Sequence, residues 1–460
     1  MTAIATSSPS PSDDAVDTAR IQRRTLRLLA TTQVIGGIGV TIGISVGGLL
    51  AARLGGVTIS GLAQSASVVG GALLAVPVVR IMNEYGRRPG LVLAYLVGAT
   101  GSVVVVVAAV LGWVPLLLGG MLLFGGATTA GLQARYTAVD LAEPRRRGRQ
   151  LSLVVWATTI GAVTAPNLAS WAGRTVSGVG LPSLSGPFVF STVAFLTAAV
   201  VLLILLRPDP LLVARETAAR AGAAEGADPA PGRSSSAGGR PDRSLRLAFA
   251  VISGSPAARL GIAAVAVGHL VMVGVMAMTP VHIDKTHSGG DVLPVVGLVL
   301  SLHIAGMYAF APVVGWLTDR AGRRAVILGG IVLLLAACAV AGTAGHDTVR
   351  LVVGLVLLGL GWSGTMVAGS TLLSESVPAD VRPSAQGLSD LLMGLGGAGA
   401  GAVSGVIVGL AGYGVLTMLA ALATVPLLGL ALRPVPEPLS GPPAGAVPRA
   451  AADDDVPAGG

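Results

Sequence analysis

The chain has 460 residues, of which 53% are hydrophobic and only 11% are charged, and its mean hydropathy is +0.79. Because a typical soluble domain carries about 25% charged residues, this composition excludes an ordinary soluble protein and indicates a chain embedded in a lipid bilayer. The 30 basic residues exceed the 22 acidic ones and give a net charge of +8, whose meaning depends on where the basic residues lie.

The first half of the chain predicts six membrane-spanning helices. Residues 1–25 are polar, and we expect them to form a disordered N-terminal tail. We interpret residues 26–206 as a six-helix bundle, because apolar runs long enough to cross a bilayer recur along them. These runs cover about 26–50, 57–79, 90–111, 114–136, 151–173 and 187–206.

A polar segment separates this bundle from a second one. Residues 207–246 hold almost no bulky apolar residue, so we expect a disordered linker, which extends to residue 257. Residues 258–433 are expected to form the second six-helix bundle, and residues 434–460 a disordered C-terminal tail. The six predicted spans of this half cover about 258–282, 292–317, 325–343, 348–373, 387–411 and 412–433.

The basic residues are distributed unevenly about these spans. With twelve spans both termini lie on one side of the membrane, and only four of the 30 basic residues fall in the loops of the other side. These four are Arg53, Arg174, Lys285 and Arg350. Short cytoplasmic loops are rich in Lys and Arg, so the pattern predicts a multipass protein of the cell membrane with both termini in the cytoplasm. The charge therefore reports topology, and we expect no nucleic-acid partner.

A loop motif resembles that of a known family. Residues 315–324 read GWLTDRAGRR, in which glycines permit a tight turn. The string resembles the GxLxDRxGRR signature of the major facilitator superfamily. The matching positions are Gly315, Leu317, Asp319, Arg320, Gly322, Arg323 and Arg324. The resemblance implies an all-α integral membrane fold of twelve helices in two six-helix bundles, and transport by alternating access.

The same loop recurs in the first half, 236 residues earlier, with changes. Gly86, Arg87 and Arg88 are present, but Asn83 stands at the position of the signature aspartate. In the family these loop charges are thought to latch helices on the cytoplasmic side. We expect Asp140, at the inner end of the fourth span, to pair with Arg87 or Arg88. Parallel halves of this kind place the solute site near the midplane, between the bundles.

Polar side chains inside the spans are candidates for solute or proton binding. No Asp or Glu lies in the middle of a predicted span. His269 and His303 each lie about eleven residues, or roughly 16 Å, from a span boundary, and ionisable groups at such depth are functional candidates. Gln33, Gln64 and Asn167 are candidates for lining the cavity or for hydrogen bonds between helices.

Methionines accompany the two histidines. Met272 and Met276 are four residues apart on the seventh span, as are His303 and Met307 on the eighth. Thioether and imidazole ligands suit Cu(I), and the pattern resembles that of CcoA-like copper importers within the superfamily, in which these residues are the proposed metal ligands. Related helices are also associated with riboflavin uptake, and methionine pairs at this spacing are common in packed cores.

The sequence contains no GxxxxGKS/T phosphate-binding loop and no HExxH motif, so we expect neither an enzyme nor an ATP-driven pump. Its one cysteine, Cys338, excludes an internal disulfide. We expect a monomeric secondary transporter without a cofactor, coupled to a proton gradient, whose partners are a small-molecule or ion substrate and the bilayer. The alternatives are a copper importer that uses the Met and His residues, and a transport-inactive membrane sensor.

Overall fold

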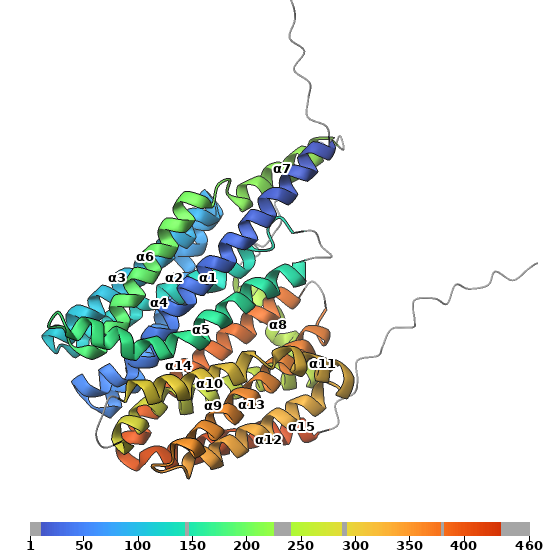
Figure 1. Ribbon diagram of the computed structural model, residues 1–460. Helices are drawn as coiled ribbons and strands as arrows, with labels where there is room; N and C mark the ends of the chain where they lie inside the picture. Colours follow the sequence, from blue (N-terminus) through green and yellow to red (C-terminus); the bar gives the residue numbers. More distant parts are fainter. Residues whose placement is uncertain (1–10, 143–146, 225–240, 288–291, 379–380, 434–460) are drawn as a thin grey trace, which may run out of the picture.

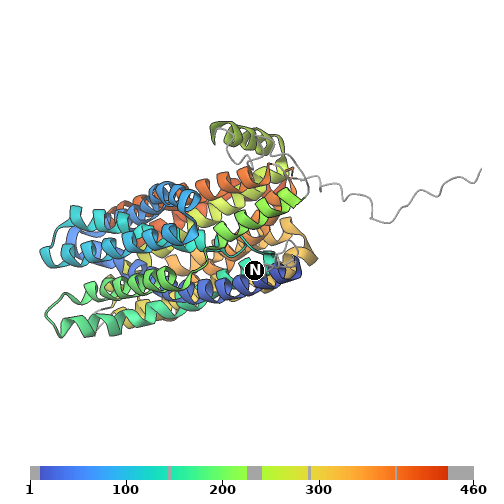
Figure 2. The same cartoon turned by 90° about the horizontal axis from the view of Figure 1, so that it is seen from above.

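The computed structural model describes residues 11–142, 147–224, 241–287, 292–378 and 381–433. Within these residues the regular structure is entirely helical, as predicted. Figure 1 shows the first half of the chain, blue to green, beside the second half, yellow to red. Figure 2 shows that the long helices of both halves run in a common direction. The described chain is therefore two helical bundles packed side by side.

The first bundle begins with a helix that is longer than its predicted span. Its helices are α1 (Pro11–Gly55), α2 (Val57–Tyr85), α3 (Arg87–Leu111), α4 (Val114–Thr137), α5 (Arg147–Ser177) and α6 (Gly186–Leu205), with a short 3₁₀ turn, η2 (Ser183–Ser185), before α6. Gly56 and Gly86 separate consecutive helices with φ of 85° and 99°, a region that favours glycine. Buried aromatic rings, among them Phe124 and Phe195, fill the bundle core.

The second bundle repeats this arrangement with two interruptions. Its helices are α9 (Pro256–Thr286), α10 (Leu293–Tyr308), α11 (Ala311–Ala321), α12 (Arg323–Gly342), α13 (Thr348–Glu375), α14 (Arg382–Ala423) and α15 (Val425–Leu432). The predicted eighth span is split into α10 and α11. The eleventh and twelfth spans share α14, which is broken by Gly412 at φ 85° and ψ 172°.

The lengths of the helices agree with twelve membrane crossings. Ten segments of the described residues are long and apolar enough to span a bilayer. One of them, residues 384–432, has 49 residues and passes through the break at Gly412, so it supplies two crossings. The helix α5 adds the twelfth, because its 31 residues extend about 46 Å at about 1.5 Å per residue.

The structure differs from the sequence prediction in two polar segments. Helix α1 extends back to Pro11, and the linker contains α7 (Pro210–Ala224) and α8 (Pro241–Gly254). The long-range hydrogen bonds of Gln22, to the carbonyl oxygen of Ala138 at 2.7 Å and to Gln150 Oε1 at 2.6 Å, explain the order in α1. Composition does not reveal such contacts. The remaining parts of the segments predicted to be disordered, 1–10, 225–240 and 434–460, lie outside the described residues.

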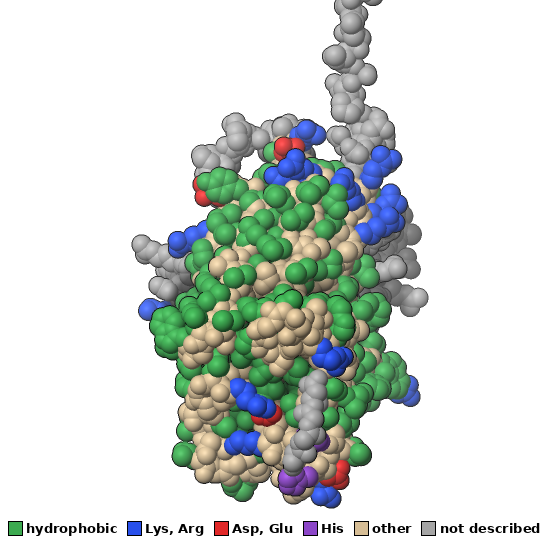
Figure 3. All heavy atoms as spheres, turned by 60° about the vertical axis from the view of Figure 1, so that its left-hand side comes forward, with side chains coloured by type: hydrophobic (Ala, Val, Ile, Leu, Met, Phe, Trp, Pro, Cys, Tyr) green, Lys and Arg blue, Asp and Glu red, His purple; other side chains and the backbone are tan. Residues whose placement is uncertain are grey.

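The two ends of the bundles differ in their loops. We call the end with the turns at Gly86 and Gly322 and with α7 the linker end, and the end with the turns at Gly56, Gly112 and Gly345 the far end. Figure 3 shows apolar side chains over the middle of one face, with histidines toward one end. Such a broad apolar surface suits contact with lipid rather than with water.

Candidate functional site

Arg323 organises the loop motif of the second bundle. Gly322 has φ 88° and lets α11 turn into α12. Arg323 donates through Nε and Nη2 to both carboxylate oxygens of Glu375 on α13, at 2.9 and 2.8 Å. It also lies 3.4 Å from Asp319 and donates to the carbonyl oxygen of Thr318 at 3.3 Å. One guanidinium thus joins α11, α12 and α13 at the linker end.

The neighbouring arginines of this motif make different contacts. Arg324 donates to the carbonyl oxygens of Ala431 and Leu432, at 2.6 and 2.7 Å, and so caps the C-terminus of α15. Arg320 lies over the ring of Trp316, 5.4 Å from its centroid. The remaining motif positions, both on α11, are Gly315 and Leu317. The motif therefore connects helices of one bundle and makes no described contact with the other bundle.

The first bundle has an equivalent ion pair. Arg87, the first residue of α3 as Arg323 is of α12, donates to both carboxylate oxygens of Asp140, at 2.8 and 3.0 Å. The two side chains are only 15% and 10% exposed. The structure therefore pairs Asp140 with Arg87. The backbone N–H of Arg88 donates instead to the carboxylate of Asp209, at 2.7 Å.

Asp209 brings the linker to the first-bundle loop. Its carboxylate also accepts from the backbone N–H of Leu211 at 3.0 Å, and so lies at the N-termini of both α3 and α7. Arg215, on α7, donates to the carbonyl oxygen of Asn83 at 2.8 Å. An acid from the linker is thus placed at the loop in which Asn83 stands where the signature has an aspartate. The sequence analysis did not identify this contact.

The two bundles pack closely where α2 meets α14. Ser65 donates to the carbonyl oxygen of Ala398 at 2.6 Å. One turn earlier, Gly61 lies against Gly401 so closely that a Cβ on Gly61 would overlap the Gly401 carbonyl oxygen. Only glycine permits this approach of two backbones.

Two further contacts join the bundles. Asn167 on α5 donates to Ser301 Oγ on α10 at 2.8 Å. Arg53, near the end of α1, forms a two-point ion pair with Asp284 on α9, with Nε 3.1 Å from Oδ2. The contacts of Ser65, Asn167 and Arg53 between the bundles lie in the halves of the helices nearest the far end. Of the two roles considered for Asn167, the structure shows a hydrogen bond between helices, here α5 and α10.

Gln33 also connects helices, within the first bundle. Its Nε2 donates to the carbonyl oxygen of Gly131 at 3.1 Å and to Thr158 Oγ1 at 3.2 Å, and Tyr95 donates to its Oε1 at 3.4 Å. The side chain is 2% exposed. These bonds join α1, α3, α4 and α5.

Gln64 and Met276 line the same small cavity between the bundles. The cavity has a volume of about 30 Å³. Thr41 and Ser45 on α1 line it from the first bundle, and Ile304 on α10 from the second. Because a cavity of this size holds only a few water molecules, a solute enters this space only if the bundles separate. Polar groups on one wall and apolar groups on the other are typical of small-molecule sites.

His269 belongs to a cluster with two aromatic residues. Trp362 Nε1 lies 3.2 Å from His269 Nδ1, and the Tyr308 ring packs edge-on against Trp362 at 5.6 Å between centroids. An indole N–H is only a donor, so Nδ1 of His269 is the acceptor and the neutral ring carries its proton on Nε2. That side of the ring faces Gly397 on α14. The sequence analysis did not identify Trp362 or Tyr308.

His303 on α10 is fully buried. The candidate methionine ligands lie in the same bundle. His303 Nδ1 lies 2.7 Å from the carbonyl oxygen of Leu355, so Nδ1 carries the proton and Nε2 has a free lone pair. Nε2 has no hydrogen-bond partner in the described structure. Met272 and Met307 belong to one hydrophobic cluster, against which Met276 packs. Among the described residues no group of three His, Cys, Asp or Glu side chains is placed to hold a metal ion.

One residue of opposite charge from each bundle lies nearer the linker end. Arg135 on α4 lies within electrostatic range of Asp390 on α14 and of Tyr308 on α10. Asp390 is exposed, whereas Arg135 is half-buried and its Nε has no hydrogen-bond partner in the part of the chain described. Both residues lie close to the ends of predicted spans, where charged residues are ordinary, so the sequence does not single them out.

Comparisons with known proteins agree with this architecture. The family model described as Major Facilitator Superfamily matches residues 29–295 and 291–453. The Uncharacterized MFS-type transporter YdeG of Bacillus subtilis (strain 168) is 36% identical over 410 residues, which cover 89% of this chain and 91% of that protein.

A more distant relative and a solved structure extend the comparison. The Riboflavin transporter RfnT of Brucella anthropi is 26% identical over 388 residues, 82% of this chain and 86% of its own. The crystal structure of a D-xylose-proton symporter superposes with a TM-score of 0.68 at 14% identity, covering 90% of this chain and 98% of that one. The latter likeness concerns the fold alone.

Proposed function

Because this chain belongs to the major facilitator superfamily, we propose that it moves a small organic solute across the cell membrane by alternating access. The observation that carries the proposal is the distribution of contacts between the bundles. Described hydrogen bonds and ion pairs between them lie toward the far end. Rocking the bundles apart at that end breaks these polar contacts, and opens the cavity at Gln64 and Met276 toward the far end.

The proposed orientation places the linker end in the cytoplasm. Only four of the 30 basic residues lie at the far end, close to the ends of their helices. This bias favours a cytoplasmic linker end and both termini inside. Reporter fusions at Val179, in a far-end loop, and at Arg215, on α7, test the orientation. The proposal requires the first to report the outside and the second the cytoplasm, and the reverse result contradicts it.

An organic solute is favoured by the side chains near the centre. Trp362 and Tyr308 provide aromatic surface beside His269, and the small cavity adds apolar and amide groups. The relative named as a riboflavin transporter makes riboflavin the first solute to test. Transport into proteoliposomes, measured over a panel of labelled organic solutes that includes riboflavin, tests this proposal. A panel in which no solute enters faster than into empty liposomes contradicts it.

We assign the proton to His269. Protonation at Nδ1 requires the bond from Trp362 to break, because a protonated ring nitrogen cannot accept a hydrogen bond. Proton binding is thereby linked to a change in side-chain packing at the centre. His269→Gln should retain solute exchange without a gradient and lose accumulation driven by a pH gradient. The control is His346→Gln, an exposed far-end histidine. Equal gradient-driven accumulation in both variants contradicts the assignment.

Copper import is a second candidate, favoured by one observation. Nε2 of His303 is buried with a free lone pair and no described hydrogen-bond partner, in a bundle whose hydrophobic core contains Met272 and Met307. Imidazole and thioether groups suit Cu(I). Cells that express the Met272→Ala, His303→Ala double variant should then accumulate less copper and transport organic solutes normally. Unchanged copper accumulation excludes this candidate, and loss of both activities indicates misfolding.

A further inference from the structure

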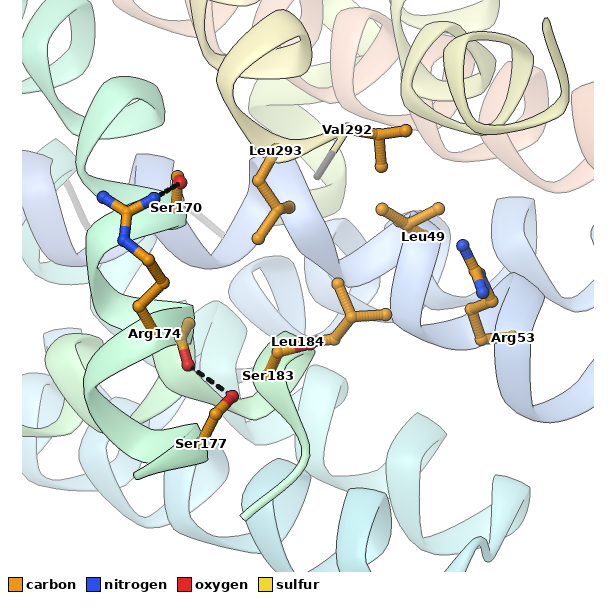
Figure 4. Close-up of a pocket in the computed structure, with 10 residues that line it drawn as sticks. Leu49, Arg53, Ser170, Arg174, Ser177, Ser183, Leu184, Val292 and Leu293 are labelled. Carbon is orange, nitrogen blue, oxygen red and sulfur yellow. Dashed lines mark hydrogen bonds between the residues drawn. The ribbon is translucent and has the colours of Figure 1, made fainter. Parts of the chain in front are cut away.

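A second cavity lies at the far end, apart from the small cavity at Gln64 and Met276. Its volume is about 450 Å³, and it is lined by α1, α5 and η2 of the first bundle and by the first residues of α10 (Figure 4). Ligand pockets for small molecules are of about this size. The far-end cavity is therefore large enough for a solute, while the small cavity at Gln64 and Met276 is not.

Its charged lining consists of two arginines. Arg53, near the end of α1, and Arg174, in the last turn of α5, lie on opposite sides of the cavity in Figure 4. Ser170, Ser177 and Ser183 add hydroxyl groups, and among the described lining residues none is acidic. Guanidinium and hydroxyl donors together are the groups that bind carboxylate and phosphate oxygens.

Both arginines lie where the chain has few basic residues. The far end holds four of the 30, and two of these four line this cavity. Basic residues at this end oppose the charge bias that orients the protein, so topology does not account for them. Arg350, another of the four, lies outside the cavity lining and donates to the carbonyl oxygen of Thr343 at 3.2 Å.

Arg53 also holds the bundles together. Its ion pair with Asp284 is one of the contacts that join α1 to α9 at the far end. Arg174 donates to Ser170 Oγ at 2.6 Å. An oxyanion in the cavity would compete with the Asp284 carboxylate for the guanidinium of Arg53, because both are acceptors for the same donors. Binding of an anion in the cavity is thereby coupled to the ion pair that holds the two bundles together at the far end.

We propose that this cavity captures a small molecule bearing a carboxylate or phosphate group between Arg53 and Arg174, and that its binding loosens the Arg53–Asp284 contact. The use of the site in solute uptake rests on the proposed transport function. The binding of the anion does not rest on that function, because it is measured without transport.

The test uses a thiol placed in the cavity. Ser177→Cys, in a Cys338→Ala background, is reacted with anionic sulfonatoethyl and cationic trimethylammonioethyl methanethiosulfonate, and the ratio of the two rates reports the local potential. Arg53→Gln and Arg174→Gln should each lower the anionic-to-cationic ratio about fivefold at low salt, if each charge lies about 8 Å from the thiol. Asp284→Asn should raise it.

The matched control is Arg350→Gln, which removes a far-end charge outside the cavity and should leave the ratio within about twofold, because distant surface charges are screened. Glutarate should slow the labelling of Ser177→Cys, whereas the equally sized neutral glutaramide should not. The proposal is overturned if both cavity variants match the control, or if glutarate and glutaramide act alike. Protection in phosphatidylglycerol nanodiscs without protection by glutarate assigns the anion to a lipid headgroup and overturns a role in solute capture.

Discussion

Replacing Gly61 by Ala should open the far end of the protein. A Cβ on Gly61 would overlap the carbonyl oxygen of Gly401 and lie 3.0 Å from the backbone nitrogen of Gly405. Because both are backbone atoms, relief requires α2 and α14 to move apart. Overpacking of this kind costs about 2 kcal/mol, and the cost falls only on the state in which the helices touch. The far-end-closed state should therefore lose about thirtyfold in population relative to the open state.

Electron–electron distance measurements test this shift. Nitroxide labels at Val179 and Val349, exposed far-end positions of the first and second bundles, report the separation there in a Cys338→Ala background. Gly61→Ala should move the distance distribution to longer values. The control is Gly329→Ala on α12, where an added Cβ meets no atom within 4 Å. If both variants keep the parent distribution, the α2–α14 contact does not distinguish the two states and the reasoning fails.

Four further substitutions test the linker end. Asp140→Asn should cost about 3 kcal/mol of stability, since its ion pair is largely buried, with side chains only 15% and 10% exposed. Glu375→Gln, at an acid whose side chain is 41% exposed, should cost below about 1 kcal/mol, and equal losses of thermal stability in detergent would contradict this. Asp209→Ala should increase amide hydrogen exchange in α7, because it removes the carboxylate at the helix N-terminus, and unchanged protection would argue against docking of the linker. Asp319→Asn should lower transport at unchanged membrane abundance, because that side chain is 77% exposed, and full transport would rule out a latch role.

Long-range regularities of the sequence predicted the fold. Apolar runs of spanning length and the repeated loop at Gly86 and Gly322 indicate twelve helices in two bundles, since a bilayer permits few alternatives. The resemblance of the loop to the family signature, with Asp140 at the inner end of the fourth span, led us to expect a pair with Arg87 or Arg88, and the structure shows the pair with Arg87. What the long-range regularities did not predict is where a helix is interrupted inside a span, as between α10 and α11 within the predicted eighth span, whereas the break in α14 at Gly412 falls at the predicted boundary of the last two spans.

Tertiary contacts between distant polar residues were not predictable from composition. Gln22 and Asp209 lie in segments with few bulky apolar residues, yet each is held by hydrogen bonds to residues more than 100 positions away. Arg135 and Asp390 lie near span ends, where charged residues are ordinary. Their electrostatic interaction depends on how the two bundles pack against each other. The close approach of Gly61 to α14 is likewise not indicated by the sequence, because many glycines lie in the predicted spans and nothing distinguishes this one.

The most direct test of the account is solute accumulation by purified protein in liposomes under an imposed inward proton gradient. The account predicts that an organic solute of the panel accumulates above its equilibrium level and leaves when a protonophore collapses the gradient. Uptake that only equilibrates, or that is the same with and without the gradient, would contradict proton-coupled alternating access.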